Sequence, residues 1–192
     1  MILALVALSA INTWRKEIRG KREFDIAFEL LSTIYKFKDV ISDIRNPFYA
    51  TGEGKTRKRS EGESEKDSKL YDRAYIVFER YRTNINVFST LLTLRYKFEA
   101  LFGKDHITIF EDVMRVRNEI FDAARSLREL WQNTQVYEAL GAEIGKADQT
   151  EIEDYAAIIW EGYRGKEDKI RIEVEQIVRK AEEICTEKIR EK

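Results

Sequence analysis

Apolar side chains recur at three- and four-residue steps along most of the chain, and charged residues fill the positions between them. This spacing places the apolar side chains on one face of a helix. From Phe24 onward it predicts a helix whose core stripe includes Ala27/Phe28, Leu31 and Ile34/Tyr35. This helix ends at Asn46-Pro47, because the residue before a proline is pushed out of the α conformation. Nothing between Asn12 and Arg45 interrupts a helix except one glycine. We therefore expect one continuous rod that includes the N-terminal segment.

The same period predicts three further long helices and one short one. Their expected N-caps are Asp67 or Ser68, Asp105 and, for the short helix, Thr150, which forms a capping-box pattern with Glu153. The last helix carries its apolar stripe from Ile170 to Ile184. Helices that each carry a single apolar stripe bury it most simply against one another. The sequence therefore predicts an all-α protein, an antiparallel four-helix bundle with long helices and one short extra helix. Long helices of this kind also occur in coiled coils.

Two segments depart from this pattern. Residues 49–67 are almost entirely Gly, Ser, Thr or charged, so they bury too little apolar surface to offset the entropy of ordering. We expect a disordered, mobile loop there. Residues 1–14, "MILALVALSAINTW", carry no charge and are apolar on every helical face from Ile2 to Leu8. The chain is thus divided into an apolar N-terminal segment, 1–14, and a helical bundle domain, 15–192.

The apolar segment is followed at once by an aromatic and basic cluster. Its members are Trp14, Arg15, Lys16, Arg19, Lys21 and Arg22. An apolar run, an interfacial Trp and then Lys/Arg is typical of the cytoplasmic end of a membrane span, and we expect these six residues at a membrane interface. A span needs about 20 apolar residues, so the segment is short. Three interpretations follow: a span truncated upstream, a shallow anchor, or a core helix of a soluble protein. The absence of a polar face favours the membrane.

Composition limits the chemistry that the chain can carry. Its 192 residues suffice for one domain with a core, and a net charge of −1 gives no overall attraction to nucleic acid. The single cysteine, Cys185, excludes an internal disulfide, and with His106 as the one histidine no Cys/His zinc site can be built. We expect no metal, no cofactor and no catalytic residues. Acids such as Glu119 are expected on solvated helix faces.

"TGEGKT", residues 51–56, ends like a phosphate-binding loop. The full pattern needs a glycine five positions before Gly54, where this chain has Tyr49, and a flanking strand and helix. Nucleotide binding is therefore not expected. The basic residues of this segment are expected to form a solvated charge run, with contact to anionic lipid as the alternative. They are Lys55, Arg57, Lys58 and Arg59.

One stretch resembles a known group of proteins. It runs from Trp14-Arg15 through Glu23-Phe24 and Tyr35 to Arg45-Asn46-Pro47-Phe48. This resembles a group of uncharacterised bacterial proteins with an N-terminal membrane span, a "W-R" exit and "R-x-P-F" after the first helix. The resemblance covers residues 14–48 and implies a membrane-anchored helical protein. It brings no activity.

The sequence therefore predicts a membrane-tethered helical adaptor or scaffold that is not an enzyme. Its bundle is expected on the cytoplasmic side, its N-terminus on membrane lipid, and its partner is expected to be a protein. The alternative is a soluble helical regulator or adaptor whose apolar N-terminus is buried in a dimer or a partner. An enzyme ranks third, because no constellation of residues supports one.

Overall fold

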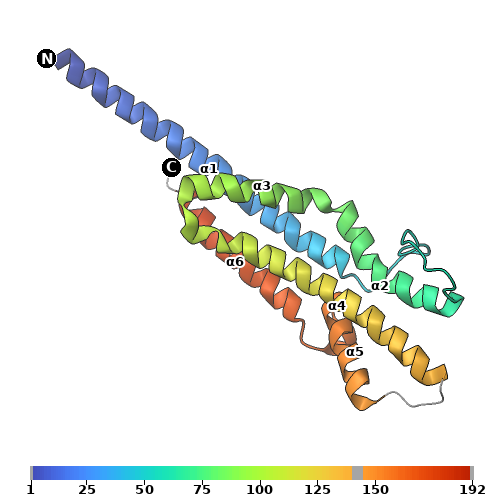
Figure 1. Ribbon diagram of the computed structural model, residues 1–192. Coiled ribbons are helices and arrows are strands. Elements are labelled where there is room, and N and C mark those ends of the chain that lie inside the picture. The colour runs from blue at the N-terminus through green and yellow to red at the C-terminus, as the bar shows by residue number, and fades with distance from the viewer. Residues whose placement is uncertain (1, 140–144, 191–192) are drawn as a thin grey trace.

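The computed structural model describes residues 2–139 and 145–190, with side chains from 10 to 134 and from 145 to 189 except 187. The described residues form α1 (Ile2–Ile44), α2 (Glu65–Thr83), α3 (Ile85–Phe102), α4 (Thr108–Ala139), α5 (Lys146–Ile159) and α6 (Lys169–Arg190). Two 3₁₀ turns, η1 (Lys104–His106) and η2 (Tyr163–Gly165), lie between them. No strand occurs in the ranges described. The fold is an all-α helical bundle, as the apolar periodicity predicts (Figure 1).

The number of helices differs from the prediction of four long helices and a short one. The expected second helix is interrupted at Asn84, which leaves the helical conformation at φ −101° and ψ 14°. The Asn84 side-chain amide instead donates to the carboxylate of Asp43 on α1, at 3.2 Å. This side-chain contact with another helix is invisible in the apolar spacing of residues 65–102. The structure therefore has α2 and α3 where one helix was predicted.

Three predicted helix starts are also wrong. Asp105 lies within the 3₁₀ turn η1 and not at the start of α4, which begins at Thr108. The N-cap of α2 is Ser64, whose hydroxyl accepts the backbone N–H of Asp67 at 3.1 Å. The short helix α5 begins at Lys146, so Thr150 lies inside it and its hydroxyl donates to the Lys146 carbonyl. Thr150 therefore cannot act in a capping box. Helices α2 and α5 both begin earlier than their first apolar residue because polar residues continue the helical backbone in the N-terminal direction.

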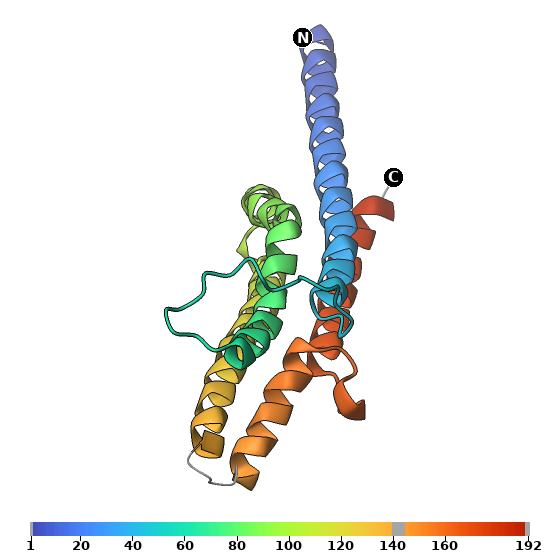
Figure 2. The ribbon, with the colours of Figure 1, turned by 90° about the vertical axis from the view of Figure 1, so that its right-hand side faces the viewer.

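Helix α1 packs against α3 and α6 and runs antiparallel to both. Phe37 of α1 meets Phe88 of α3 edge to face, with ring centroids 5.9 Å apart. The Tyr35 hydroxyl donates to Glu182 of α6 at 2.8 Å. Helix α4 completes the core through contacts with α2, α5 and α6. The views in Figures 1 and 2 agree that α1 and α6 lie side by side.

Only the C-terminal part of α1 lies in this core. Its buried side chains begin at Ala27, whereas residues 10–17 are all exposed. The helix continues without a break, as expected for one rod, and projects well beyond the other helices (Figures 1 and 2). Among the described residues, no helix is long and apolar enough to cross a membrane. Met1 and the side chains of residues 2–9, which belong to the predicted anchor, lie outside the described part of the chain.

A buried arginine joins the ends of three helices. Arg45, which is 1 % exposed, follows α1 directly and is the arginine of the "R-x-P-F" stretch. Its guanidinium donates to the carbonyls of Ile158 (2.7 Å) and Ala157 (3.0 Å) in the last turn of α5. It also pairs with Asp168, immediately before α6, at 2.8 Å. Arg45 therefore neutralises the carbonyl end of α5 and fixes α6 beside α1.

Candidate functional site

The six predicted interface residues all lie on the projecting part of α1 and are all exposed. Arg15, Arg19 and Arg22 are spaced by four and three residues, so they share one helical face. With Ala100 and Leu101 at the end of α3 they line one shallow pocket, at the level where the bundle begins. Arg19 pairs with Glu23 in the next turn, at 2.8 Å. No ion pair to the other four cations of this cluster occurs within the described residues.

Apolar side chains are exposed on the N-terminal side of these cations. Ile11 is 44 % exposed and Trp14 is 61 % exposed. An exposed indole next to a ring of cations matches the composition of helices that lie in a membrane interface. The projecting part of α1 thus offers apolar surface and positive charge to a partner outside the bundle.

The outward face of α1 is also more apolar than the sequence analysis predicted. The core face is formed by the series Ala27, Leu30, Ile34, Phe37 and Ile41. Phe28 and Tyr35, which we assigned to the core stripe, are 59 % and 43 % exposed on the opposite side. Their assignment was wrong because both faces of this helix carry large apolar residues, and spacing alone does not choose between them. Phe28 stacks on Phe24 of the same helix, with ring centroids 6.3 Å apart.

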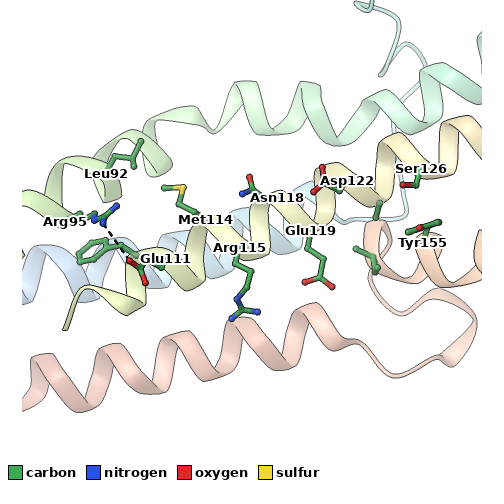
Figure 3. Close-up of a pocket in the computed structure, with 13 residues that line it drawn as sticks. Leu92, Arg95, Glu111, Met114, Arg115, Asn118, Glu119, Asp122, Ser126 and Tyr155 are labelled. Carbon is green, nitrogen blue, oxygen red and sulfur yellow. Dashed lines mark ion pairs between the residues drawn. The ribbon is translucent and has the colours of Figure 1, made fainter. Parts of the chain in front are cut away.

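An open groove of about 670 Å³ follows the exposed face of α4 (Figure 3). Leu92 and Arg95 of α3 lie at one end, and Tyr155 and Ile158 of α5 lie at the other. The residues of α4 that line it are Phe110, Glu111, Met114, Arg115, Asn118, Glu119, Asp122, Ala123 and Ser126. The sixteen steps from residue 110 to residue 126 correspond to about 24 Å of helix. The groove is therefore long and shallow, the shape of a surface for another helix rather than of a closed ligand cavity.

The charges in this groove are mostly paired, with one exception. Arg95 lies 3.8 Å from Glu111, and Arg115 pairs with Glu173 of α6 at 2.7 Å. Glu119 is half-buried, and its pKa is raised, first by burial and then by the nearby charge of Glu173. The prediction that such acids are solvated therefore fails for Glu119.

The single cysteine lies on α6 and the single histidine lies in the turn η1. Cys185 is fully buried on α6, and burial raises the pKa of its thiol to about 12, which disfavours the nucleophilic thiolate. The ring of His106 lies edge-on to Phe98, with centroids 6.4 Å apart. Across the described residues, no group of three or more His, Cys, Asp or Glu side chains could hold a metal ion.

The "TGEGKT" segment binds an anion that belongs to the protein itself. The backbone N–H groups of Gly54 and Thr56 donate to the carboxylate of Glu79 on α2, at 2.6 and 2.9 Å, and the Thr56 hydroxyl adds a third hydrogen bond. Burial raises the pKa of Glu79, but these hydrogen bonds outweigh it, and the pKa lies below its ordinary value. The backbone N–H groups that would face a phosphate in a nucleotide-binding loop are used to attach this segment to α2.

The basic residues of the same segment are only partly solvated. Arg57, predicted in a solvated run, is 9 % exposed and donates to Asp72 (2.7 Å) and to both oxygens of Glu63. The prediction is wrong for Arg57 because acids on both sides satisfy its guanidinium. Lys55 and Lys58 are exposed. Residues 49–64 thus follow a defined path without a helix or strand, and helix α2 includes residues 65–67. The predicted mobility of the segment stays a prediction.

With this geometry in hand, we compared the chain with known proteins. No protein family, curated protein or solved structure matches it. The function is therefore inferred from the physical properties of these surfaces.

Proposed function

We propose that this protein is a helical adaptor tethered to a membrane surface by the N-terminal half of α1, with its bundle on the cytoplasmic side. The observation that carries the proposal is the projection of an apolar, cation-flanked helix beyond the core. Ile11 and Trp14 gain no cover from the bundle, and Arg15, Arg19 and Arg22 gather on one face where the bundle begins.

The dimensions of the projecting segment fit a shallow anchor. Residues 2–14 span about 20 Å as a helix, which exceeds one leaflet of a hydrocarbon core about 30 Å thick. Each Lys or Arg close to an anionic surface contributes about 1 kcal/mol. The apolar residues would enter the acyl boundary, and the cations would remain among the headgroups. This is the physical basis for assigning the segment to membrane lipid.

The rest of the chain would supply the adaptor body. We propose that α2 with α3, and α5 with α6, each act as one broken rod beside α1 and α4, which gives a four-rod antiparallel bundle. The groove on α4 is the surface that we assign to a protein partner, because it joins apolar side chains such as Phe110 and Met114 to the half-buried Glu119. We propose that this body acts through contacts with its partner and not by catalysis.

Vesicle co-sedimentation tests the tether. The protein should bind vesicles that contain phosphatidylserine more tightly than vesicles of phosphatidylcholine alone, and added salt should weaken the binding. Replacing Arg15, Arg19 and Arg22 together by Gln should reduce affinity for the anionic vesicles by about 100-fold, the equivalent of about 3 kcal/mol. A matched control removes three exposed cations elsewhere: Lys36, Lys38 and Lys104. Equal binding to both vesicle types, or equal losses in the two triple variants, would contradict the tether.

A second candidate is a soluble adaptor whose N-terminal segment is covered by protein instead of lipid. The exposed aromatic side chain of Phe28, on the outward face of α1, favours this alternative because it lies beyond the apolar segment and inside the level of the bundle. Failure to bind any vesicle, together with self-association in solution, would support it over the tether.

A further inference from the structure

The pocket between the projecting part of α1 and the end of α3 is lined by cationic and apolar side chains. Arg15, Arg19 and Arg22 of α1 contribute the positive charge. The other lining residues are Ile18 of α1 and, from the last turn of α3, Ala100 and Leu101. No acid is among the described residues that line it. Its volume of about 420 Å³ is that of a site for a small ligand.

Two of the three guanidinium groups are unused by the fold. Arg19 donates from its Nε to Glu23 at 2.8 Å. Neither Arg15 nor Arg22 forms an ion pair or a side-chain hydrogen bond with another described residue. The carbonyl end of α3 carries about half a negative charge, which is small beside three full positive charges. The pocket therefore presents a positive potential and free N–H donors to a ligand.

The spacing of the three arginines fits a single phosphate group. They are four and three residues apart, so their Cβ atoms follow one helical face at steps of about 5–6 Å. Long side chains at this spacing can reach the same anion, and each guanidinium forms a planar fork that matches two phosphate oxygens. The apolar side chains of α3 restrict water on the opposite wall, which strengthens such contacts.

This arrangement favours a phosphate monoester over a phosphate diester. A monoester has three terminal oxygens and a charge of about −1.5 to −2 at neutral pH. A diester has two free oxygens, a single charge and a substituent on each side that hinders the approach of several guanidinium groups. In phosphatidylserine the phosphate is a diester, and its headgroup also carries an ammonium that the arginines repel. The pocket should therefore distinguish anionic lipids by more than their charge.

The position of the pocket favours a lipid headgroup over a free phosphate compound. Trp14 directly precedes Arg15 and is 61 % exposed, and Ile11, one turn earlier, is 44 % exposed. When these apolar side chains enter the acyl boundary, the pocket lies at the level of the headgroups, because Arg15 to Arg22 cover only about 10 Å of helix.

We propose that the pocket formed by Arg15, Arg19 and Arg22 beside the end of α3 binds the phosphate monoester headgroup of an anionic lipid, of which phosphatidic acid is the simplest. This inference rests on the proposed tether and adds a headgroup preference to it.

Vesicles with equal surface potential test the preference. Vesicles that contain phosphatidic acid and vesicles that contain phosphatidylserine are adjusted to the same electrophoretic mobility, so that the attraction by charge alone is equal. In co-sedimentation, the wild-type chain should bind the phosphatidic acid vesicles at least about 10-fold more tightly. Equal affinity for the two kinds of vesicle would overturn the proposal and leave the tether standing.

A substitution that conserves charge separates the pocket from the tether. Arg15→Lys/Arg22→Lys keeps both positive charges but removes two planar forks. This variant should bind phosphatidylserine vesicles as the wild type does, and its preference for phosphatidic acid should fall to within about 3-fold. Arg171→Lys/Arg179→Lys is the matched control, because it makes the same change at two exposed arginines of α6 and should keep the preference. A full preference in the pocket variant, or an equal loss in the control, would overturn the proposal.

Glycerol 3-phosphate distinguishes the two sources of a monoester, since it carries the same phosphate without acyl chains. Measured by calorimetry without vesicles, it should bind far more weakly than the phosphatidic acid vesicles do. Binding of equal strength would overturn the lipid assignment in favour of a free phosphate compound. Absence of binding to both anionic vesicles would contradict the tether and, with it, the lipid headgroup.

Discussion

The projecting half of α1 and the segment 49–64 differ in an unexpected way. Apolar side chains of the first are exposed to solvent, whereas parts of the second, which is polar, are buried. Ala10, Ile11 and Trp14 belong to the end of an apolar run, yet all three are exposed. Residues 49–64 are almost entirely polar, yet Gly54 and Arg57 are buried against α2. Polar chain can be fixed wherever each buried donor finds an acceptor, and apolar chain stays uncovered wherever the fold supplies no second surface. The exposed apolar surface that the fold leaves uncovered therefore lies on the projecting half of α1.

Substitutions on the two faces of α1 should give the largest difference in unfolding free energy. Phe37 is fully buried and Phe28, nine residues earlier, is 59 % exposed. Phe37→Ala should lower the free energy of unfolding by about 3–5 kcal/mol through lost burial and a cavity. Phe28→Ala should change it by less than about 0.5 kcal/mol. Urea unfolding of both variants, at a concentration where the chain is monomeric, measures the difference. Similar losses would mean that the outward face of α1 packs in the fold.

Two neighbouring arginines test whether charge pairing holds the 49–64 segment. Arg57→Ala leaves Asp72 and Glu63 without their buried partner and should cost about 3 kcal/mol of unfolding free energy. Arg59→Ala removes a mostly exposed side chain, 3.4 Å from Asp72, and should cost less than about 0.5 kcal/mol. Urea unfolding followed by circular dichroism compares them. An Arg57 variant as stable as the Arg59 variant would show that the segment contributes nothing to stability.

Two glycines of the same segment test its path along α2. Gly54 has φ +82°, and a Cβ there would lie 1.9 Å from the Asp72 carbonyl oxygen. Gly54→Ala should therefore cost about 1–3 kcal/mol and detach the segment from Glu79. Gly52 also has a positive φ, of +112°, but its Cβ would meet no atom within 4 Å, so Gly52→Ala is the control for backbone strain alone.

Hydrogen exchange of the segment sharpens this test and measures the predicted mobility directly. In the wild-type chain the amides of Gly54 and Thr56 should exchange slowly, because Glu79 accepts both. In Gly54→Ala they should exchange as fast as exposed loop amides. Fast exchange already in the wild type would favour the mobile loop that composition predicts.

Acidification should weaken the segment over a defined pH range. Hydrogen bonds from Arg57, opposed by burial, lower the pKa of Glu63 from 4.5 to about 2. A carboxyl whose folded-state pKa is depressed stabilises the fold above its unfolded-state pKa, and this contribution is lost as the pH falls through the folded-state value. Stability should therefore decline between pH 4.5 and 2, and Glu63→Gln should flatten this part of the profile. An unchanged profile in that variant would assign the acid sensitivity to other groups.

Local sequence patterns predict most of the helices, but they do not predict which polar side chains contact distant segments. The rod ends at Asn46-Pro47 as expected, since proline acts on the residue beside it. The break at Asn84 depends on Asp43, about forty residues away, and no local pattern contains that information. Arg45 and Arg57 were missed as buried residues for the same reason, because their acceptors come from distant segments.

The predicted interface cluster shows the same limit. The exposure of this cluster agrees with the polar composition of residues 14–22. The exposure of Phe28 could not be predicted in the same way, because it follows from the structure, in which Ala27 and Phe37 fill the core.

Urea unfolding of a chain that lacks residues 1–14 tests the central claim most directly, which is that this segment serves contacts outside the bundle. Since the buried side chains of α1 begin at Ala27, the shortened monomer should unfold within about 0.5 kcal/mol of the full chain. A loss of several kcal/mol would show that the segment belongs to the core and would contradict the tether.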